Sequence, residues 1–152
     1  MQDLAKVAEK GKAELPPALS ARISFVAHDF FTPNPVKDAD VFLFRLVLHD
    51  WPDDDAVRIL RRVTPSMTPK TRLVVCDVVV PPAGALPYLE ERQVRSVDMQ
   101  MMTLFNSWER SLEEWEGLFA KADPALRVAS VAKPVGSYVS IMEVTLTGKG
   151  VA

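Results

Sequence analysis

The fold is decided by residues 41–60, whose sequence is VFLFRLVLHDWPDDDAVRIL. Residues 41–46 are apolar apart from Arg45 and are rich in β-branched and aromatic side chains. This pattern is typical of a strand that is covered on both faces, as in a parallel sheet. After residue 53, apolar residues recur every three or four positions, which predicts a helix. We expect Asp50 to cap this helix and Pro52 to lie in its first turn.

A second buried strand is predicted over residues 73–80, and Pro81-Pro82 ends it. A strand, a helix and a strand in this order imply two parallel strands joined by a right-handed crossover. On the N-terminal side, residues 4–13 have weak helical spacing and residues 23–27 form a short strand pattern.

Two further helices and a hairpin are predicted in the C-terminal half. Residues 89–105 have helical spacing, with an apolar stripe made of Val94, Val97, Met101, Leu104 and Phe105. Ser111 and Glu114 have the spacing of a capping box, which opens a helix whose buried face would be Leu112, Trp115, Leu118, Phe119 and Ala122. Residues 126–132 and 138–146 are joined by a connection short enough to require an antiparallel hairpin. The sequence therefore predicts a mixed α/β sheet with an antiparallel edge.

Length and charge restrict the classes of protein that fit. The 152 residues suit one domain, and 18 Lys and Arg against 20 Asp and Glu give a net charge of −2 without a long block of either sign. Nucleic acid is therefore disfavoured as a partner, and no apolar run is long enough to cross a membrane. One cysteine and no secretory signal make the cytoplasm the expected location. No spacing of metal ligands is present, so we expect no metal.

Polar residues follow the predicted strands, where ligands bind in open α/β sheets. Asp29 follows the first strand, His49 and Asp50 follow the second, and Asp77 lies late in the third, while Glu109 precedes the capped helix. A histidine with nearby carboxylates can act as a general base. Each residue also has a plainer interpretation: His49 at a helix entry, Asp50 as a cap, Asp77 in an ion pair and Glu109 as an exposed side chain. Met101 and Met102 could simply fill the core.

The sequence resembles the small-molecule O-methyltransferases of plants and fungi. The histidine motif Leu46-Val47-Leu48-His49-Asp50-Trp51-Pro52-Asp53 carries the resemblance. Further motifs follow in family order: Gln2-Asp3-Leu4, His28-Asp29-Phe30-Phe31, Val74-Val75-Cys76-Asp77, Asp98-Met99-Gln100-Met101-Met102 and Glu109-Arg110-Ser111. Nearly the whole chain is covered.

The resemblance implies an enzyme that moves a methyl group from S-adenosylmethionine to a hydroxyl group of a small molecule, and we expect this hydroxyl group to be phenolic. His49 would be the general base, held by Asp77 and Glu109. The residues implied to hold the cofactor are Asp3 at the ribose, Asp29 and Phe30 at the adenine, and Arg45 near the methionyl end. Acceptor contacts are implied for Met101, Met102 and Trp108, and for Asp50 beside them.

The same resemblance predicts an incomplete fold. Residues 1–152 match the C-terminal part of a methyltransferase domain, a partial Rossmann-like sheet that lacks the first strand and glycine-rich loop. We also expect residues 1–152 not to include the family's N-terminal dimerisation domain. Residues 41–46 would then form an exposed edge, so we expect an oligomer or a chain completed by another. The alternative function is a catalytically inactive, truncated methyltransferase that serves as a subunit or interaction module.

Overall fold

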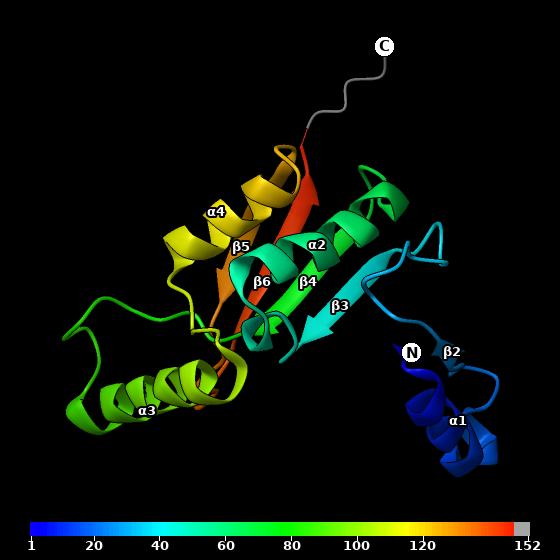
Figure 1. The fold of residues 1–152 in the computed structure, drawn as a ribbon, viewed down its shortest axis with the longest axis horizontal. Coiled ribbons are helices and arrows are strands. Elements are labelled where there is room, and N and C mark those ends of the chain that lie inside the picture. The colour runs from blue at the N-terminus through cyan, green and yellow to red at the C-terminus, as the bar shows by residue number, and fades with distance from the viewer. Residues whose placement is uncertain (148–152) are drawn as a thin grey trace.

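A computed structural model describes residues 1–147 and contains a four-stranded mixed sheet with the strand order β3-β4-β6-β5 (Figure 1). β3 and β4 are parallel, whereas β6 is antiparallel to both β4 and β5. The strands span Val41–Arg45 (β3), Arg72–Asp77 (β4), Leu126–Ala132 (β5) and Ser140–Leu146 (β6). The predicted parallel pair and the closing antiparallel hairpin are therefore confirmed, although β4 ends at Asp77, before the predicted residue 80, and β6 begins two residues later than predicted.

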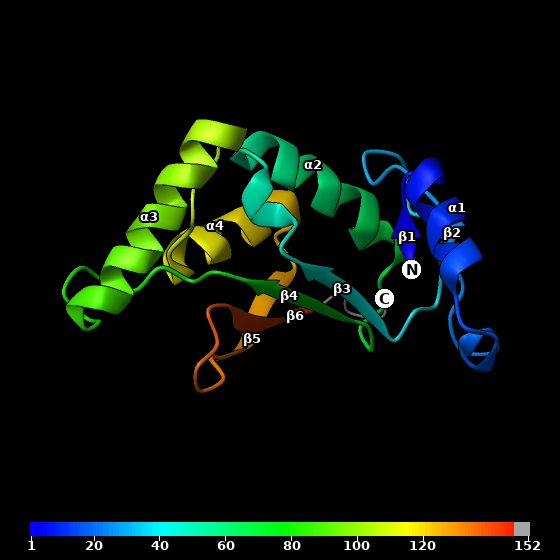
Figure 2. The same ribbon diagram turned by 90° about the horizontal axis from the view of Figure 1, so that it is seen from below.

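The helices α2 (Asp53–Val63) and α4 (Leu112–Ala122) cover one face of this sheet (Figures 1 and 2). The core lies between these two helices and the sheet. Its fully buried members include Leu48, Ile59, Leu60, Leu73, Val75, Trp115, Phe119, Met142 and Val144. Burial of this apolar surface is the main force that holds the two layers together.

The prediction that residues 41–46 are covered on both faces is wrong for the described residues. Phe42 faces the core and is 8% exposed, whereas Val41 and Leu43 on the other face are 52% and 62% exposed. The reason is that α2 and α4 pack on the same side of the sheet, so alternate residues of β3 have no covering layer. An apolar run alone does not reveal this, because side chains of a strand point to opposite faces whatever lies above them.

The N-terminal residues form a small unit beside the free edge of β3 (Figure 1). The strands β1 (Gln2–Asp3) and β2 (Val26–Ala27) pair in parallel, and α1 (Ala5–Glu14) packs against β2. The predicted strand 23–27 is therefore shorter than expected, because only two of its residues find a partner. Hydrogen bonds from Arg62 Nε to the carbonyl of Phe31, 2.9 Å, and from the amide of Asn34 to the carbonyl of Arg62, 3.1 Å, join this unit to α2.

The long helix α3 (Tyr88–Phe105) projects from the end of the sheet (Figure 2). Val94 and Met101 are its buried residues, while Leu104 and Phe105 are exposed, so the predicted apolar stripe is only partly a core face. The capping box of Ser111 and Glu114 is confirmed. The face of α4 is confirmed except at Leu112, which is exposed.

The start of α2 differs from the prediction. Asp50 does not cap this helix, because it belongs to the short 3-10 turn Leu48–Asp50, and Pro52 occupies the N-cap position without a side-chain hydrogen bond. Other short 3-10 turns span Pro17–Leu19 and Thr64–Ser66. No helix among residues 1–147 is both long and apolar enough to cross a bilayer.

Candidate active site

His49 is placed where β3 and β4 both end. The chain leaves β3 through Leu46, which has a φ of 52°, a conformation that residues other than glycine rarely adopt. The Leu46 amide still donates to the carbonyl of Cys76 on β4, 3.1 Å away. The backbone therefore turns sharply and enters the 3-10 turn that carries His49. Asp77, the last residue of β4, lies at the same carboxyl end of the parallel pair.

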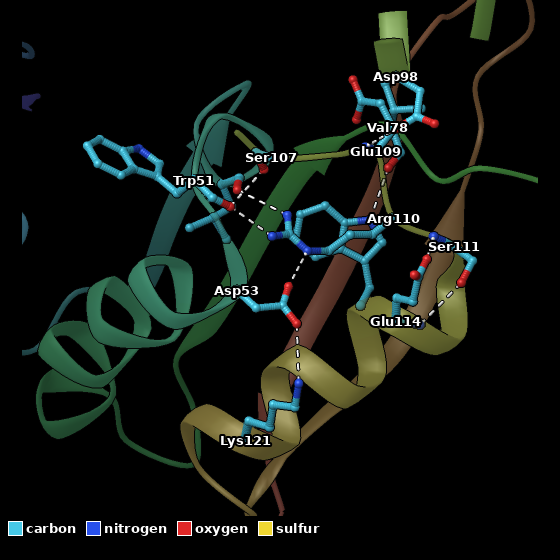
Figure 3. Close-up of polar contacts among 12 residues, drawn as sticks. Trp51, Asp53, Val78, Asp98, Ser107, Glu109, Arg110, Ser111, Glu114 and Lys121 are labelled. Atoms are coloured by element: carbon cyan, nitrogen blue, oxygen red, sulfur yellow. Dashed lines mark hydrogen bonds and ion pairs between the residues drawn. The ribbon is translucent and has the colours of Figure 1, made fainter. Parts of the chain in front are cut away.

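His49 and Glu109 form a buried pair. His49 Nδ1 is 2.9 Å from Glu109 Oε1, and the two side chains are 9% and 0% exposed. An ionised carboxylate can only accept, so the proton of a neutral His49 ring must lie on Nδ1. Nε2 then keeps its lone pair, and its nearest acidic neighbour is Asp50 Oδ1 at 3.5 Å. The backbone amide of Glu109 donates to Asp98 Oδ1 at 2.9 Å, which fixes the segment that carries the carboxylate (Figure 3).

The charges around the ring favour a protonated imidazole. Burial alone would lower the pKa of His49, but the hydrogen bond to Glu109 and the negative charges of Asp77, Glu109 and Asp50 outweigh it, so the pKa is raised above 6.5. The plainer interpretation of Glu109 as an exposed residue is wrong.

Asp77 differs from the role that the resemblance implied. It is fully buried and neither of its carboxylate oxygens has a hydrogen-bond partner within residues 1–147. Burial, reinforced by the charge of Glu109 and opposed by the charge of His49 and by the nearby backbone amide of Leu48, raises its pKa from 3.8 to about 7. Asp77 is therefore close enough to act on His49 through its charge, but it does not hold the ring by a hydrogen bond.

Tyr138 is a site residue that the sequence reasoning missed. It stands two residues before β6, whose first residue, Ser140, is paired with Asp77. Its hydroxyl and Glu109 Oε2 are both buried and have no hydrogen-bond partner in the described part of the chain. Burial and the charge of Glu109 raise the pKa of Tyr138. A polar residue that enters a strand beside a buried acid would have been the signal to look for.

Only some of the residues expected to contact the acceptor line a common cavity. An open cavity of about 650 Å³ lies between the His49 turn and the end of α3, and Asp50 and Met102 line it together with Trp51, Pro52 and Phe105. Met101 is instead buried in α3. The Trp108 ring is partly exposed and packs under the guanidinium of Arg110, 5.2 Å from its centroid. The structure thus brings two of the four expected residues to this cavity.

The residues expected to hold a cofactor lie at the N-terminal unit and at the end of β3. Asp3 Oδ1 accepts from the Leu4 amide at 2.8 Å, and Asp29 Oδ1 accepts from the Phe31 amide at 2.9 Å. Because β1 and β2 are parallel, Asp3 and Asp29 lie at the same edge of that sheet. Phe30 packs edge-on against Trp51, with ring centroids 5.7 Å apart. Arg45, the last residue of β3, is exposed.

The mixed sheet, with polar groups gathered at the carboxyl ends of its parallel strands, is an α/β domain with the arrangement of a ligand-binding site at those ends. The chain belongs to the O-methyltransferase domain family, whose model matches residues 1–123. A fungal relative, O-methyltransferase fsr2 of Gibberella fujikuroi, is 43% identical over 149 residues, which are 96% of this chain and 38% of that protein. The chain thus spans about two fifths of the length of this relative.

Two solved structures show the same fold. The O-methyltransferase NcsB1 from neocarzinostatin biosynthesis matches with a TM-score of 0.77 and 33% identity, over 95% of this chain and 40% of its own. It was solved with S-adenosyl-L-homocysteine and 1,4-dihydroxy-2-naphthoic acid. A pericyclic reaction enzyme matches with a TM-score of 0.83 and 33% identity, over 95% of this chain and 35% of its own. Since one fold supports both reactions, the reaction of this chain has to be argued from its site.

Proposed function

We propose that this chain carries the acid–base half of an O-methyltransferase site, which transfers a methyl group from S-adenosylmethionine to a hydroxyl group of a small aromatic molecule. The observation that carries the proposal is the buried pair of His49 and Glu109, which leaves Nε2 of His49 free to accept a proton. Family membership supports the type of reaction. The dihydroxynaphthoic acid bound in NcsB1 supports an acceptor with phenolic hydroxyl groups.

The residues present fit part of the cofactor. The Asp3 carboxylate uses one oxygen for the Leu4 amide and is otherwise exposed, so it can accept hydrogen bonds from ribose hydroxyl groups. Phe30, half-buried next to Asp29, offers an aromatic surface to an adenine ring. Arg45 offers a positive charge to a carboxylate. S-adenosylmethionine, when bound, supplies an electrophilic methyl group on a positively charged sulfur.

His49 would remove the proton of the acceptor hydroxyl as the methyl group is transferred. The acids around His49 raise its pKa from 6.5 toward that of a phenol, about 10, which favours this transfer in a positioned pair. The proton moves to Nε2, and Glu109 stabilises the imidazolium that forms, since its carboxylate accepts from Nδ1–H. Asp50 is 3.5 Å from Nε2 and lines the cavity, which supports a contact between Asp50 and the acceptor.

Methyl transfer to a panel of phenols tests the proposal. His49→Ala should lower the rate by about 100-fold or more, the usual contribution of a general base, without unfolding the chain. Glu109→Gln should act in the same direction, whereas Glu113→Gln, an exposed carboxylate in the first turn of α4, is the matched control and should leave the rate unchanged. Turnover that survives His49→Ala would overturn the role of His49.

A second candidate is supported by the exposed side chains of β3. Within residues 1–147, β3 is an outer strand of its sheet, and Val41 and Leu43 are exposed on one face. Such an edge can pair with a strand of another chain, which is the property of a subunit or interaction module. Self-association on size-exclusion chromatography, together with no turnover of any phenol, would favour this function over catalysis by the chain itself.

A further inference from the structure

Arg110 is a fully buried cation next to the active-site glutamate. Its side chain has no exposed surface, although burying a charged group without partners costs several kcal/mol. Its guanidinium lies between the turn that carries His49, the start of α2 and the start of α4 (Figure 3). The indole rings of Trp108 and Trp115 lie 5.2 Å and 5.1 Å from the guanidinium carbon. The sequence reasoning gave Arg110 no role.

The guanidinium holds both sides of the His49 turn. Nη1 donates to the carbonyl of Leu48 at 3.2 Å, and Nη2 donates to the carbonyl of Trp51 at 2.8 Å. These two carbonyls stand before and after His49 in the chain. Nε donates to Asp53 Oδ1 at 3.0 Å, at the first turn of α2. Three donor nitrogens on one rigid, planar group, each with its own acceptor, are an arrangement that a guanidinium, but not an ammonium group, can offer.

The segment that carries Arg110 also carries Glu109, the partner of His49. Glu109 is the residue directly before Arg110, and the carbonyl of Arg110 accepts from the amide of Val80 at 2.9 Å. The Trp51 carbonyl also accepts from Ser107 Oγ at 2.9 Å, so the segment between α3 and α4 makes a second hydrogen bond to the end of the His49 turn. One short segment therefore delivers the Glu109 carboxylate to Nδ1 and fixes the backbone on which His49 stands.

We propose that Arg110 is a positioning residue, which keeps His49 in register with Glu109 by clamping the Leu48 and Trp51 carbonyls on either side of the histidine. The inference rests on the proposed function of His49 as a base. The inference also goes beyond that function, because it makes Arg110 the residue that determines which imidazole nitrogen faces the acceptor. Without the clamp, the turn can shift away from Glu109, and Nδ1 then loses the acceptor that fixes its proton.

A purely structural role is the competing explanation, and an exposed arginine with a similar pattern of bonds serves as the control for it. Arg61 also donates to two backbone carbonyls, those of Ala122 at 3.4 Å and Lys121 at 2.9 Å, where it joins α2 to the end of α4. Those carbonyls lie at the C-terminal end of α4, whereas Arg110 lies just before its N-terminal end. Arg61→Lys should therefore cost stability without changing the state of His49.

Nitrogen-15 NMR of the whole chain, labelled at histidine, tests the inference without any need for turnover. In the wild-type chain we expect a neutral His49 ring that carries its proton on Nδ1, and a pKa raised by the three acids that face the ring: Glu109, Asp77 and Asp50. In Arg110→Lys the proton should redistribute toward Nε2, and the pKa should fall toward its ordinary value. Arg61→Lys should show the wild-type signals.

An unchanged tautomer and pKa of His49 in Arg110→Lys would overturn the inference. If this variant does not fold, Asp53→Ala removes the carboxylate partner of Arg110 at a partly exposed position, with exposed Asp54→Ala as its control. Asp53→Ala should move the His49 signals in the same direction by a smaller amount, and identical signals in both aspartate variants would equally overturn it. Because no step depends on methyl transfer, failure of the clamp is distinguishable from failure of the proposed function.

Discussion

Replacing Asp77 by asparagine should make the chain more stable at about pH 8 and flatten the pH dependence of its stability. The Asp77 carboxyl group is fully buried, and within residues 1–147 neither oxygen has a hydrogen-bond partner, so the folded protein resists its ionisation. Its pKa is about 7 in the folded chain, against 3.8 for an aspartate side chain that is open to water, as in the unfolded chain. A carboxyl group whose pKa is raised by folding binds more protons in the folded state, so stability falls as pH rises between these two values.

The size of the effect follows from this difference. About three pH units, at 1.36 kcal/mol each, correspond to about 4 kcal/mol of stability that is lost between about pH 4 and pH 7. An asparagine of the same shape has no charge to bury, and its amide lacks partners just as the neutral carboxyl group does, so that cost cancels in the comparison. We therefore expect Asp77→Asn to raise the free energy of unfolding by about 4 kcal/mol at about pH 8. At about pH 3, where the carboxyl group is neutral in both states, the gain should vanish.

Urea unfolding followed by tryptophan fluorescence measures this difference, because Trp115 is fully buried in the core. Asp54→Asn, an exposed carboxylate at the start of α2, is the control and should change little at any pH. His49 adds a second slope of the same sign in both proteins: its pKa is raised, so its contribution is present below about pH 6.5 and lost as pH rises through the folded value. Asp77→Asn being less stable than wild type at about pH 8 would refute an unpartnered carboxyl group.

Three further changes test other parts of the structure. Glu109→Gln removes a hydrogen bond between charged groups worth about 1.5–3 kcal/mol, so the pKa of His49 should fall and the acid limb of any pH–rate profile should move to lower pH; an unmoved limb would contradict the pairing. Trp115→Phe leaves the Val78 carbonyl without its 2.9 Å bond from Nε1 and should destabilise the chain by about 1–3 kcal/mol in urea titrations; a loss under about 0.5 kcal/mol would count against the contact. Ser111→Ala should cost about 1 kcal/mol by removing the cap of α4, and Ser111→Thr should recover most of it.

The local signals in the sequence predicted the elements better than their surroundings. The spacing of Ser111 and Glu114 identified the start of α4 because a capping box is a local interaction. The exposed face of β3 could not be predicted in the same way, since Val41 and Leu43 look like core residues until the position of α2 and α4 is known. Asp50 has a capping side chain, but the turn at Leu48–Asp50 moves it out of the N-cap position.

The sequence predicted which residues belong to the site better than it predicted the hydrogen bonds between them. The histidine motif and the order of the strands placed His49 near Asp77 and Glu109, but only Glu109 makes a hydrogen bond to the ring. Arg110 lies in the motif Glu109-Arg110-Ser111, but its role could not be predicted, because it depends on backbone carbonyls, which carry no sequence signal. Tyr138 was missed because it comes near Glu109 only through the pairing of β6 with β4.

The contact between His49 and Glu109 joins residues that are 60 positions apart in the chain. Closing so long a loop loses conformational entropy before the contact can return any energy, so the pair has to wait until β4, α3 and the start of α4 are in place. A partly folded molecule can have its helices and its β3–β4 ladder and still lack a histidine with a fixed proton. Circular dichroism would not distinguish such a molecule from the native one, whereas the protonation of the His49 ring would, which makes that ring a reporter of whether this long loop has closed.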